Sequence, residues 1–163
     1  MNLRIRRRVS GAPFIHPMHP TPRTAILAPG FQETKLVRVF PTGWTEEAAR
    51  FHPSSIAAPL DQLRRISRRG IELSHAVVAL TYLGQQGLSE DDRDLFWDSF
   101  GVPVFEQHLG PANELLAMEC EAHAGLHVIS DFEDPGLDHV SCVCGNPAPR
   151  FRRRIQDLAD MLA

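Results

Sequence analysis

The three cysteines of the chain lie in two short clusters, which constrain its fold more than any other feature of the sequence. Cys120 and His123 form a Cys-x-x-His pair, and Cys142 and Cys144 form a Cys-x-Cys pair that Gly145 follows. An odd number of cysteines does not build a disulfide framework, whereas thiolates combined with an imidazole suit zinc. The pattern predicts a tetrahedral zinc site. Four protein ligands leave no position for water, so the expected role of the zinc is structural.

The fourth ligand has two candidates. His123 is close to Cys120 in the sequence, and His127 lies across a predicted hairpin from Cys120. Gly145 favours the metal interpretation, because thiolates two residues apart need a tight backbone turn and glycine tolerates a positive φ. The competing interpretation is that the cysteines are reduced residues of an ordinary core.

Strand-like and helix-like segments alternate through the rest of the chain. Short apolar or alternating runs predict strands, and apolar residues at helical spacing behind a capping residue predict helices. The expected strands are 24–28, 35–40, 76–82, 102–105, 115–120 and 126–132, and the expected helices are 45–51, 59–69, 89–100 and 155–162. This order predicts an α/β fold with a mixed sheet, flanking helices, a C-terminal β-hairpin and a zinc-knuckle-like loop. We expect a single domain over 24–163, with 115–150 as its hairpin and metal subregion.

Charge is distributed unevenly along the chain. Residues 1–23 carry five arginines, four prolines and no acidic residue, which predicts a flexible basic arm. Residues 89–138 carry thirteen acidic residues against Arg93 alone, and the net charge of the chain is −3. An acidic body makes nucleic acid an unexpected partner. No run approaches the roughly 20 apolar residues of a membrane helix, and no secretory signal follows the basic start, so we expect a cytoplasmic protein without membrane association.

A further pattern extends over the last two thirds of the chain. Its stretches are Pro53-Ser54-Ser55, the apolar run 76–82, LSEDDR at 88–93, FGVPV at 100–104, ECEAHAGLHV at 119–128 and CVCGNPAPR at 142–150. In this order they resemble the core of the phenylacetate–coenzyme A ligase family of adenylate-forming enzymes, over roughly residues 53–163. The resemblance implies a partial, truncated adenylate-forming-enzyme core.

The functional motifs of that family are poorly matched. Residues 1–50 hold no phosphate loop rich in serine, threonine and glycine, and the ribose-binding aspartate and the domain with the catalytic lysine have no counterpart. The threonine of the family's aromatic-Gly-x-Thr-Glu motif is missing, and only Glu114 can replace its acid. We therefore expect neither ATP nor AMP binding, and no independent adenylation. For any other ligand, the resemblance implies binding in two loops, at Gly84, Gln85, Gly87, His108, Gly110, Asn113 and Glu114.

Three functions follow from these features. The first is a non-catalytic, zinc-stabilised module that binds a protein partner, with a full-length ligase or an acyl-carrying protein as candidates. The alternative is one subunit of a split acyl-activating ligase, which uses ATP to join an acid to coenzyme A or to a protein. The third is a small zinc-binding regulatory or nucleic-acid module that uses the basic arm. A truncated core also exposes a sheet edge, which favours a homodimer.

Overall fold

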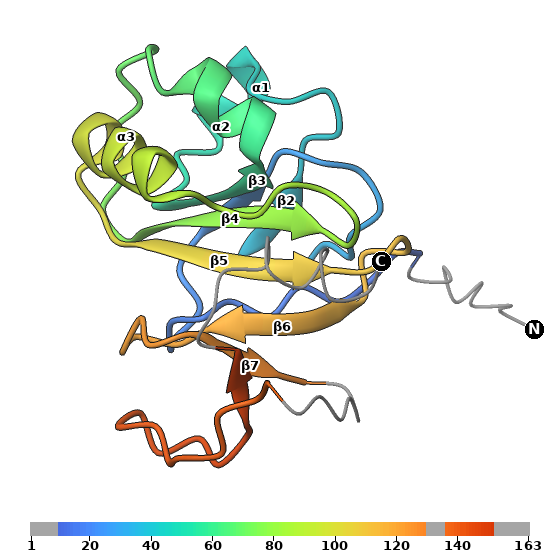
Figure 1. The fold of residues 1–163 in the computed structure, drawn as a ribbon. Coiled ribbons are helices and arrows are strands. Elements are labelled where there is room, and N and C mark those ends of the chain that lie inside the picture. The colour runs from blue at the N-terminus through green and yellow to red at the C-terminus, as the bar shows by residue number, and fades with distance from the viewer. Residues whose placement is uncertain (1–9, 130–135, 152–163) are drawn as a thin grey trace, which may run out of the picture.

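The computed structural model describes residues 10–129 and 136–151, and within them eight strands form one mixed sheet. The strand order is β2-β1-β3-β4-β5-β6-β7-β8. Strands β1 to β5 are parallel, and β6, β7 and β8 extend the sheet in an antiparallel manner (Figure 1). The α/β fold with a mixed sheet and a C-terminal hairpin is therefore confirmed. The strands are β1 (Thr24–Ile26), β2 (Val37–Val39), β3 (Ser55–Pro59), β4 (Ala76–Tyr82), β5 (Val104–Leu109), β6 (Leu115–Glu119), β7 (Leu126–Val128) and β8 (Arg150–Phe151).

Three helices cover one face of the parallel part of the sheet (Figure 1). They are α1 (Glu46–Arg50), α2 (Leu60–Ile66) and α3 (Glu90–Phe100). Thr45 caps α1, since its hydroxyl accepts the N–H of Ala48 at 3.4 Å. Ser89 and Asp92 form a capping box at the start of α3, and Gly101 ends that helix with a φ of 65°. Thr45, Ser89 and Gly101 thus cap the helices expected at 45–51 and 89–100. α2 ends at Ile66, before the expected end at 69, and Pro59 at its start makes no side-chain capping bond.

The side chains of β4 alternate between two apolar clusters. Val77 faces the helices and packs with Leu63 of α2 and Phe96 of α3, all of them fully buried. Val78 faces the opposite side of the sheet and packs with Leu80 in a second cluster. Because β4 is covered on both faces, its sequence is a nearly continuous apolar run.

Residues 10–23 differ from the flexible arm that their composition predicts. Phe14 packs against Phe31, with ring centroids 6.2 Å apart. His16 is only 2% exposed, and its Nε2 lies 2.9 Å from the hydroxyl of Ser55 in β3. This segment covers the sheet face opposite the helices, because the second apolar cluster would otherwise meet water. Residues 1–9 of the expected arm lie outside the described residues.

Two strands differ most from the expectation, whereas β1 and β2 are shorter than expected by two or three residues. β3 has no counterpart among the expected strands, because its residues other than Ile56 carry little strand propensity and its place between β1 and β4 determines its conformation. β5 continues to Leu109, beyond the expected end at 105, because both of its edges are paired. His108 therefore lies in a strand rather than in a loop. The expected helix 155–162 and the end of the expected strand 126–132 lie outside the described residues. None of the helices described is long and apolar enough to cross a membrane.

Candidate metal centre and adjoining polar network

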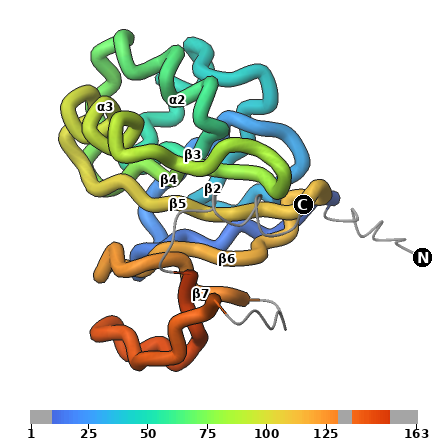
Figure 2. Tube along the Cα trace, in the orientation of Figure 1, coloured from blue at the N-terminus to red at the C-terminus, as the bar shows by residue number. Residues whose placement is uncertain are grey.

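Three segments bring together one cluster of metal-ligating side chains. Cys120 directly follows β6, His127 lies in β7, and Cys142 and Cys144 lie in the loop before β8. Their ligand atoms all lie within 4.8 Å of one another. Figure 2 shows this part of the chain, in orange and red, on the side of the sheet's antiparallel end, away from the helices. The four side chains form a group that can hold a metal ion.

The spacing of the ligand atoms fits a tetrahedral ion. Zinc bonds of about 2.3 Å to sulfur and about 2.0 Å to nitrogen place neighbouring ligand atoms about 3.8 Å (sulfur to sulfur) and about 3.5 Å (sulfur to nitrogen) apart. The Sγ atoms of Cys120 and Cys142 are 3.6 Å apart, and Cys144 Sγ is 3.4 Å from His127 Nε2. Three thiolates and one imidazole are also a common donor set of structural zinc sites. Both geometry and chemistry therefore suit zinc.

Two similar turns hold the cysteines. The N–H of His123 donates to the carbonyl of Cys120 at 3.0 Å, and the N–H of Gly145 donates to the carbonyl of Cys142 at 3.0 Å. The residues that close the turns both have a positive φ, 48° at His123 and 84° at Gly145. Glycine adopts this conformation without strain, so Gly145 permits the tight turn expected at its position from the sequence.

Backbone N–H groups point at all three sulfur atoms. The N–H of Asn146 lies 3.4 Å from Cys144 Sγ, and those of Ala122 and Cys144 donate to the sulfurs of Cys120 and Cys142. Such bonds favour the thiolate, and the one from Cys144 is the main reason that the pKa of Cys142 falls to about 6. At Cys120 burial dominates and raises the pKa to about 11. A metal ion bound at neutral pH would therefore displace a proton from Cys120.

His127, and not His123, belongs to the cluster. The carbonyl of Ala148 lies 3.1 Å from His127 Nδ1 and can only accept, so Nδ1 carries the proton and Nε2 presents its lone pair to the sulfur atoms. His123 instead stacks on Phe105, with ring centroids 4.7 Å apart, and its Nδ1 lies 3.8 Å from the carboxylate of Glu119. Of the two candidates for the fourth ligand, the structure thus favours His127.

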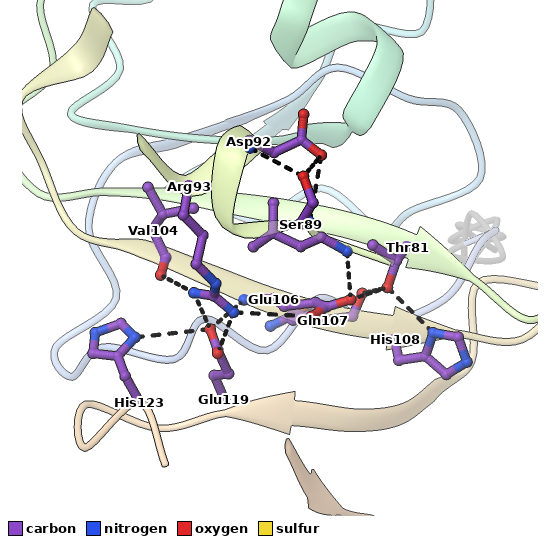
Figure 3. Close-up of polar contacts among 11 residues, drawn as sticks. Thr81, Ser89, Asp92, Arg93, Val104, Glu106, Gln107, His108, Glu119 and His123 are labelled. Atoms are coloured by element: carbon purple, nitrogen blue, oxygen red, sulfur yellow. Dashed lines mark hydrogen bonds and ion pairs between the residues drawn. The ribbon is translucent and has the colours of Figure 1, made fainter. Parts of the chain in front are cut away.

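A buried polar network adjoins the metal cluster (Figure 3). Arg93 of α3 donates two hydrogen bonds to the carboxylate of Glu119, at 2.5 and 3.2 Å, and Glu119 also accepts the backbone N–H of Glu106 at 2.8 Å. Burial raises the pKa of Glu106. Burial acts in the same direction on Glu119, but hydrogen bonds from His123 and Arg93 outweigh it and lower the pKa of Glu119. Glu119 is therefore the ionised partner of Arg93, and Glu106 takes up a proton more readily.

Thr81 and His108 continue the network toward the carboxyl ends of β4 and β5 (Figure 3). The Thr81 hydroxyl donates to the carboxylate of Glu106 at 2.9 Å, and His108 Nδ1 lies 3.2 Å from the Thr81 hydroxyl oxygen. A hydroxyl has one proton, so the proton of the second contact belongs to Nδ1 of His108. Its Nε2 has no hydrogen-bond partner among the residues that the structure describes. Because burial lowers the pKa of His108, the ring is neutral at neutral pH and Nε2 is an acceptor.

The other residues that the family resemblance assigns to ligand binding occupy two neighbouring loops. The loops lie side by side, because the N–H of Leu83 donates to the carbonyl of Leu109 at 2.9 Å. The carboxylate of Glu114 is turned back onto its own loop, where it accepts the N–H of Ala112 at 2.7 Å and fills the space beside Gly110. Asn113 donates to a carbonyl of the loop after β1. The loop after β4 holds Gly84, Gln85 and Gly87, and the loop after β5 holds Gly110, Asn113 and Glu114.

Reasoning from the sequence missed the buried group of Arg93, Glu106 and Glu119. A signal for it exists: Glu106 directly follows the apolar residues Val104 and Phe105 of a strand, and in the structure all six positions of that strand, β5, are buried. A carboxylate in such a strand needs a buried partner. The partner, Arg93, is the one basic residue in the acidic region 89–138.

Comparison with known proteins does not assign a family. No family model matches the chain, and no curated protein matches it. The relationship to the phenylacetate–coenzyme A ligase family therefore remains a prediction from the order of the sequence motifs.

Proposed function

We propose that the chain is a zinc-stabilised binding module, related to the core of phenylacetate–coenzyme A ligases but without adenylation activity of its own. The observation that carries the proposal is the cluster of Cys120, His127, Cys142 and Cys144, whose donors and spacing suit zinc. The apolar cluster around the antiparallel strands contains only two buried residues in the described part of the chain. Such a small core favours stabilisation by a metal, which ties β6, β7 and the loop before β8 together.

The environment of the two candidate ligand loops supports a role other than catalysis. Adenylation develops negative charge on phosphate, which an enzyme stabilises with cations and aimed hydrogen-bond donors. Residues 83–87 and 110–114 contain no lysine or arginine. Glu114, the one acid in these loops, already accepts a backbone N–H of its own loop.

A protein is the partner that we propose, with a full-length ligase or an acyl-carrying protein as candidates. Pairing of two copies through β2 receives no support, since the outward N–H groups of this edge strand are already bonded. The N–H of Val37 donates to the hydroxyl of Thr34 at 3.1 Å, and the N–H of Val39 donates to the carboxylate of Glu33 at 3.0 Å. An edge whose donors are occupied by its own loop resists strand addition. A homodimer would therefore need another surface.

Metal content tests the proposal directly. Protein purified without added zinc is expected to contain about one zinc per chain by plasma mass spectrometry, and the Cys142→Ser variant is expected to lose it. The His123→Ala variant is the matched control, because His123 lies in the same turn as Cys120 but outside the cluster, and it should keep the metal. Absence of zinc from the unmodified protein, or equal zinc in the Cys142→Ser variant, would refute the zinc-stabilised module.

A split acyl-activating ligase is the second candidate. The observation that favours it is the acceptor Nε2 of His108 near the carboxyl ends of β4 and β5, where open α/β sheets bind ligands. It requires a second chain that carries a phosphate loop and a lysine domain. Formation of an acyl-adenylate only when the product of a neighbouring reading frame is added would establish it. Turnover of ATP and an acid by this chain alone, abolished by Glu114→Gln, would refute both the split ligase and the non-catalytic module.

A further inference from the structure

The four members of the metal cluster differ in their exposure to solvent. His127 and Cys142 are buried, at 2% and 5% exposed, and Cys120 is intermediate. Cys144 is exposed, and the residue before it, Val143, is 93% exposed. Cys144 is therefore the member of the cluster that a small solute reaches most readily.

A second sulfur lies within reach of Cys144. All ligand atoms of the cluster are within 4.8 Å of one another, so a modified Cys144 has two neighbouring sulfurs close by. Exposed thiolates next to a second thiol are the ones that peroxides oxidise reversibly, because the second thiol traps the first oxidation product as a disulfide. Exposure and proximity thus coincide at one residue.

We propose that Cys144 is the peroxide-reactive ligand of the metal centre, and that Cys120 resolves its oxidation as a disulfide. This inference rests on the proposed zinc-stabilised function. The Cys144 thiolate attacks one oxygen of the peroxide, the O–O bond breaks, and the leaving hydroxide takes a proton to become water. The Cys120 thiolate then attacks the sulfenic sulfur of Cys144, the S–O bond breaks, and the leaving hydroxide takes a proton from solvent to become a second water. The two thiolates supply the two electrons that reduce the peroxide.

Cys120 is a better resolving residue than Cys142. A disulfide between Cys142 and Cys144 would close a ring through a single intervening residue, which strains the bond geometry. The Cys142 sulfur also accepts the backbone N–H of Cys144, which holds it against the main chain. Cys120 lies on a different segment, 22 positions before Cys142, and its turn is separately closed.

Oxidation would replace one connection by another. The metal would lose two of its four ligands, and four-coordinate binding would end. The disulfide would still join the turn after β6 to the loop before β8, while His127 and Cys142 would be released. The C-terminal part of the sheet would therefore stay attached but lose its metal.

The test uses the full chain loaded with zinc and treated with hydrogen peroxide, with zinc release followed by a colorimetric chelator and thiols followed by intact mass and peptide mapping. Two variants with the same donor set, Cys144→His and Cys142→His, form a matched pair. We expect peroxide to speed zinc release about tenfold in the unmodified chain and in Cys142→His, and not in Cys144→His. The map of the unmodified chain should show a disulfide between Cys144 and Cys120.

Three results would overturn the inference: release from Cys144→His as fast as from Cys142→His, first oxidation at Cys120 or Cys142, or a disulfide that excludes Cys144. If either variant fails to load zinc, the inference is tested on the unmodified chain alone, by finding which cysteine is oxidised first at limiting peroxide. Lack of zinc in the untreated chain would refute the proposed function instead. Even then, the peptide map of the oxidised chain would show whether Cys144 reacts first and pairs with Cys120.

Discussion

Acidification is expected to destabilise the fold through the buried His16. Its Nδ1 accepts the N–H of Met18 at 3.0 Å, and its Nε2 lies 2.9 Å from the hydroxyl of Ser55. Because Nδ1 accepts, the neutral ring carries its proton on Nε2 and donates it to Ser55. A second proton on Nδ1 would remove that acceptor and bury a charge. Burial accordingly lowers the pKa of His16 to about 4.

The size of the effect follows from this pKa. In the unfolded chain the pKa of His16 returns to 6.5, so the unfolded state binds the proton more readily than the folded state between the two values. The contribution to stability is therefore complete above pH 6.5 and is lost as the pH falls toward 4. The whole difference corresponds to about 3 kcal/mol, of which about 2 kcal/mol is lost between pH 7 and pH 5.

Urea unfolding of the zinc-loaded chain and of its His16→Gln variant measures this contribution. Glutamine keeps a donor for Ser55 but does not titrate, and the metal ligands are the same in both proteins, so their own pH dependence cancels. Between pH 7 and pH 5 the free energy of unfolding should fall by about 2 kcal/mol more in the unmodified chain. Equal pH dependence in the two proteins, or a midpoint near pH 6.5 for His16 in a proton NMR titration, would refute the reasoning.

Three further predictions concern stability in denaturant titrations at pH 7. Glu119→Gln removes the closer of the two carboxylates beside the half-buried Arg93, leaving only Glu106 at 4.0 Å, and should lower the free energy of unfolding by about 3 kcal/mol; a loss below about 1 kcal/mol would show that the pair is solvated. Asp92→Asn weakens the pair with Arg64, formed by two hydrogen bonds of 2.8 Å, and the capping box of α3, and should cost about 1–2 kcal/mol; an unchanged midpoint would exclude both contributions. Gly101→Ala should cost about 1 kcal/mol, because φ is 65° and no neighbour lies near the added methyl group; a stabilised variant would contradict the left-handed cap.

The parts of the fold that the sequence predicts are those whose ends are set by local chemistry. Ser89, Asp92 and Gly101 place both ends of α3, since each acts on the backbone of its own helix. β4 is recognisable because it is apolar and long. β3 is different: apart from Ile56 its residues have no strand preference of their own, and it is a strand because two neighbouring strands pair with it. Pairing between distant segments leaves no local signal in such a stretch.

The metal centre likewise has one part that local sequence predicts and one part that depends on how distant strands pair. Cysteine spacing identifies three of the four members of the cluster, because few other functions place thiols in this pattern. The choice between the two histidines depends on the register of β7 against β6, in which His127 pairs with Met118. A shift by one residue would turn His127 to the other face of the sheet. Spacing in the sequence therefore leaves two candidates, and only the register separates them.

The metal-ligating cluster and the buried network are joined by adjacent residues, so a bound metal would act beyond its own loop. Cys120 follows Glu119 directly, and the turn that begins at Cys120 ends at His123, whose ring contacts Glu119. Glu119 in turn binds Arg93 of α3 and the backbone of β5. A metal that fixes the Cys120 turn therefore also fixes the acid on which the arginine of α3 depends. This connection gives the small antiparallel end of the sheet a polar link to the helical layer, which its few apolar contacts alone do not provide.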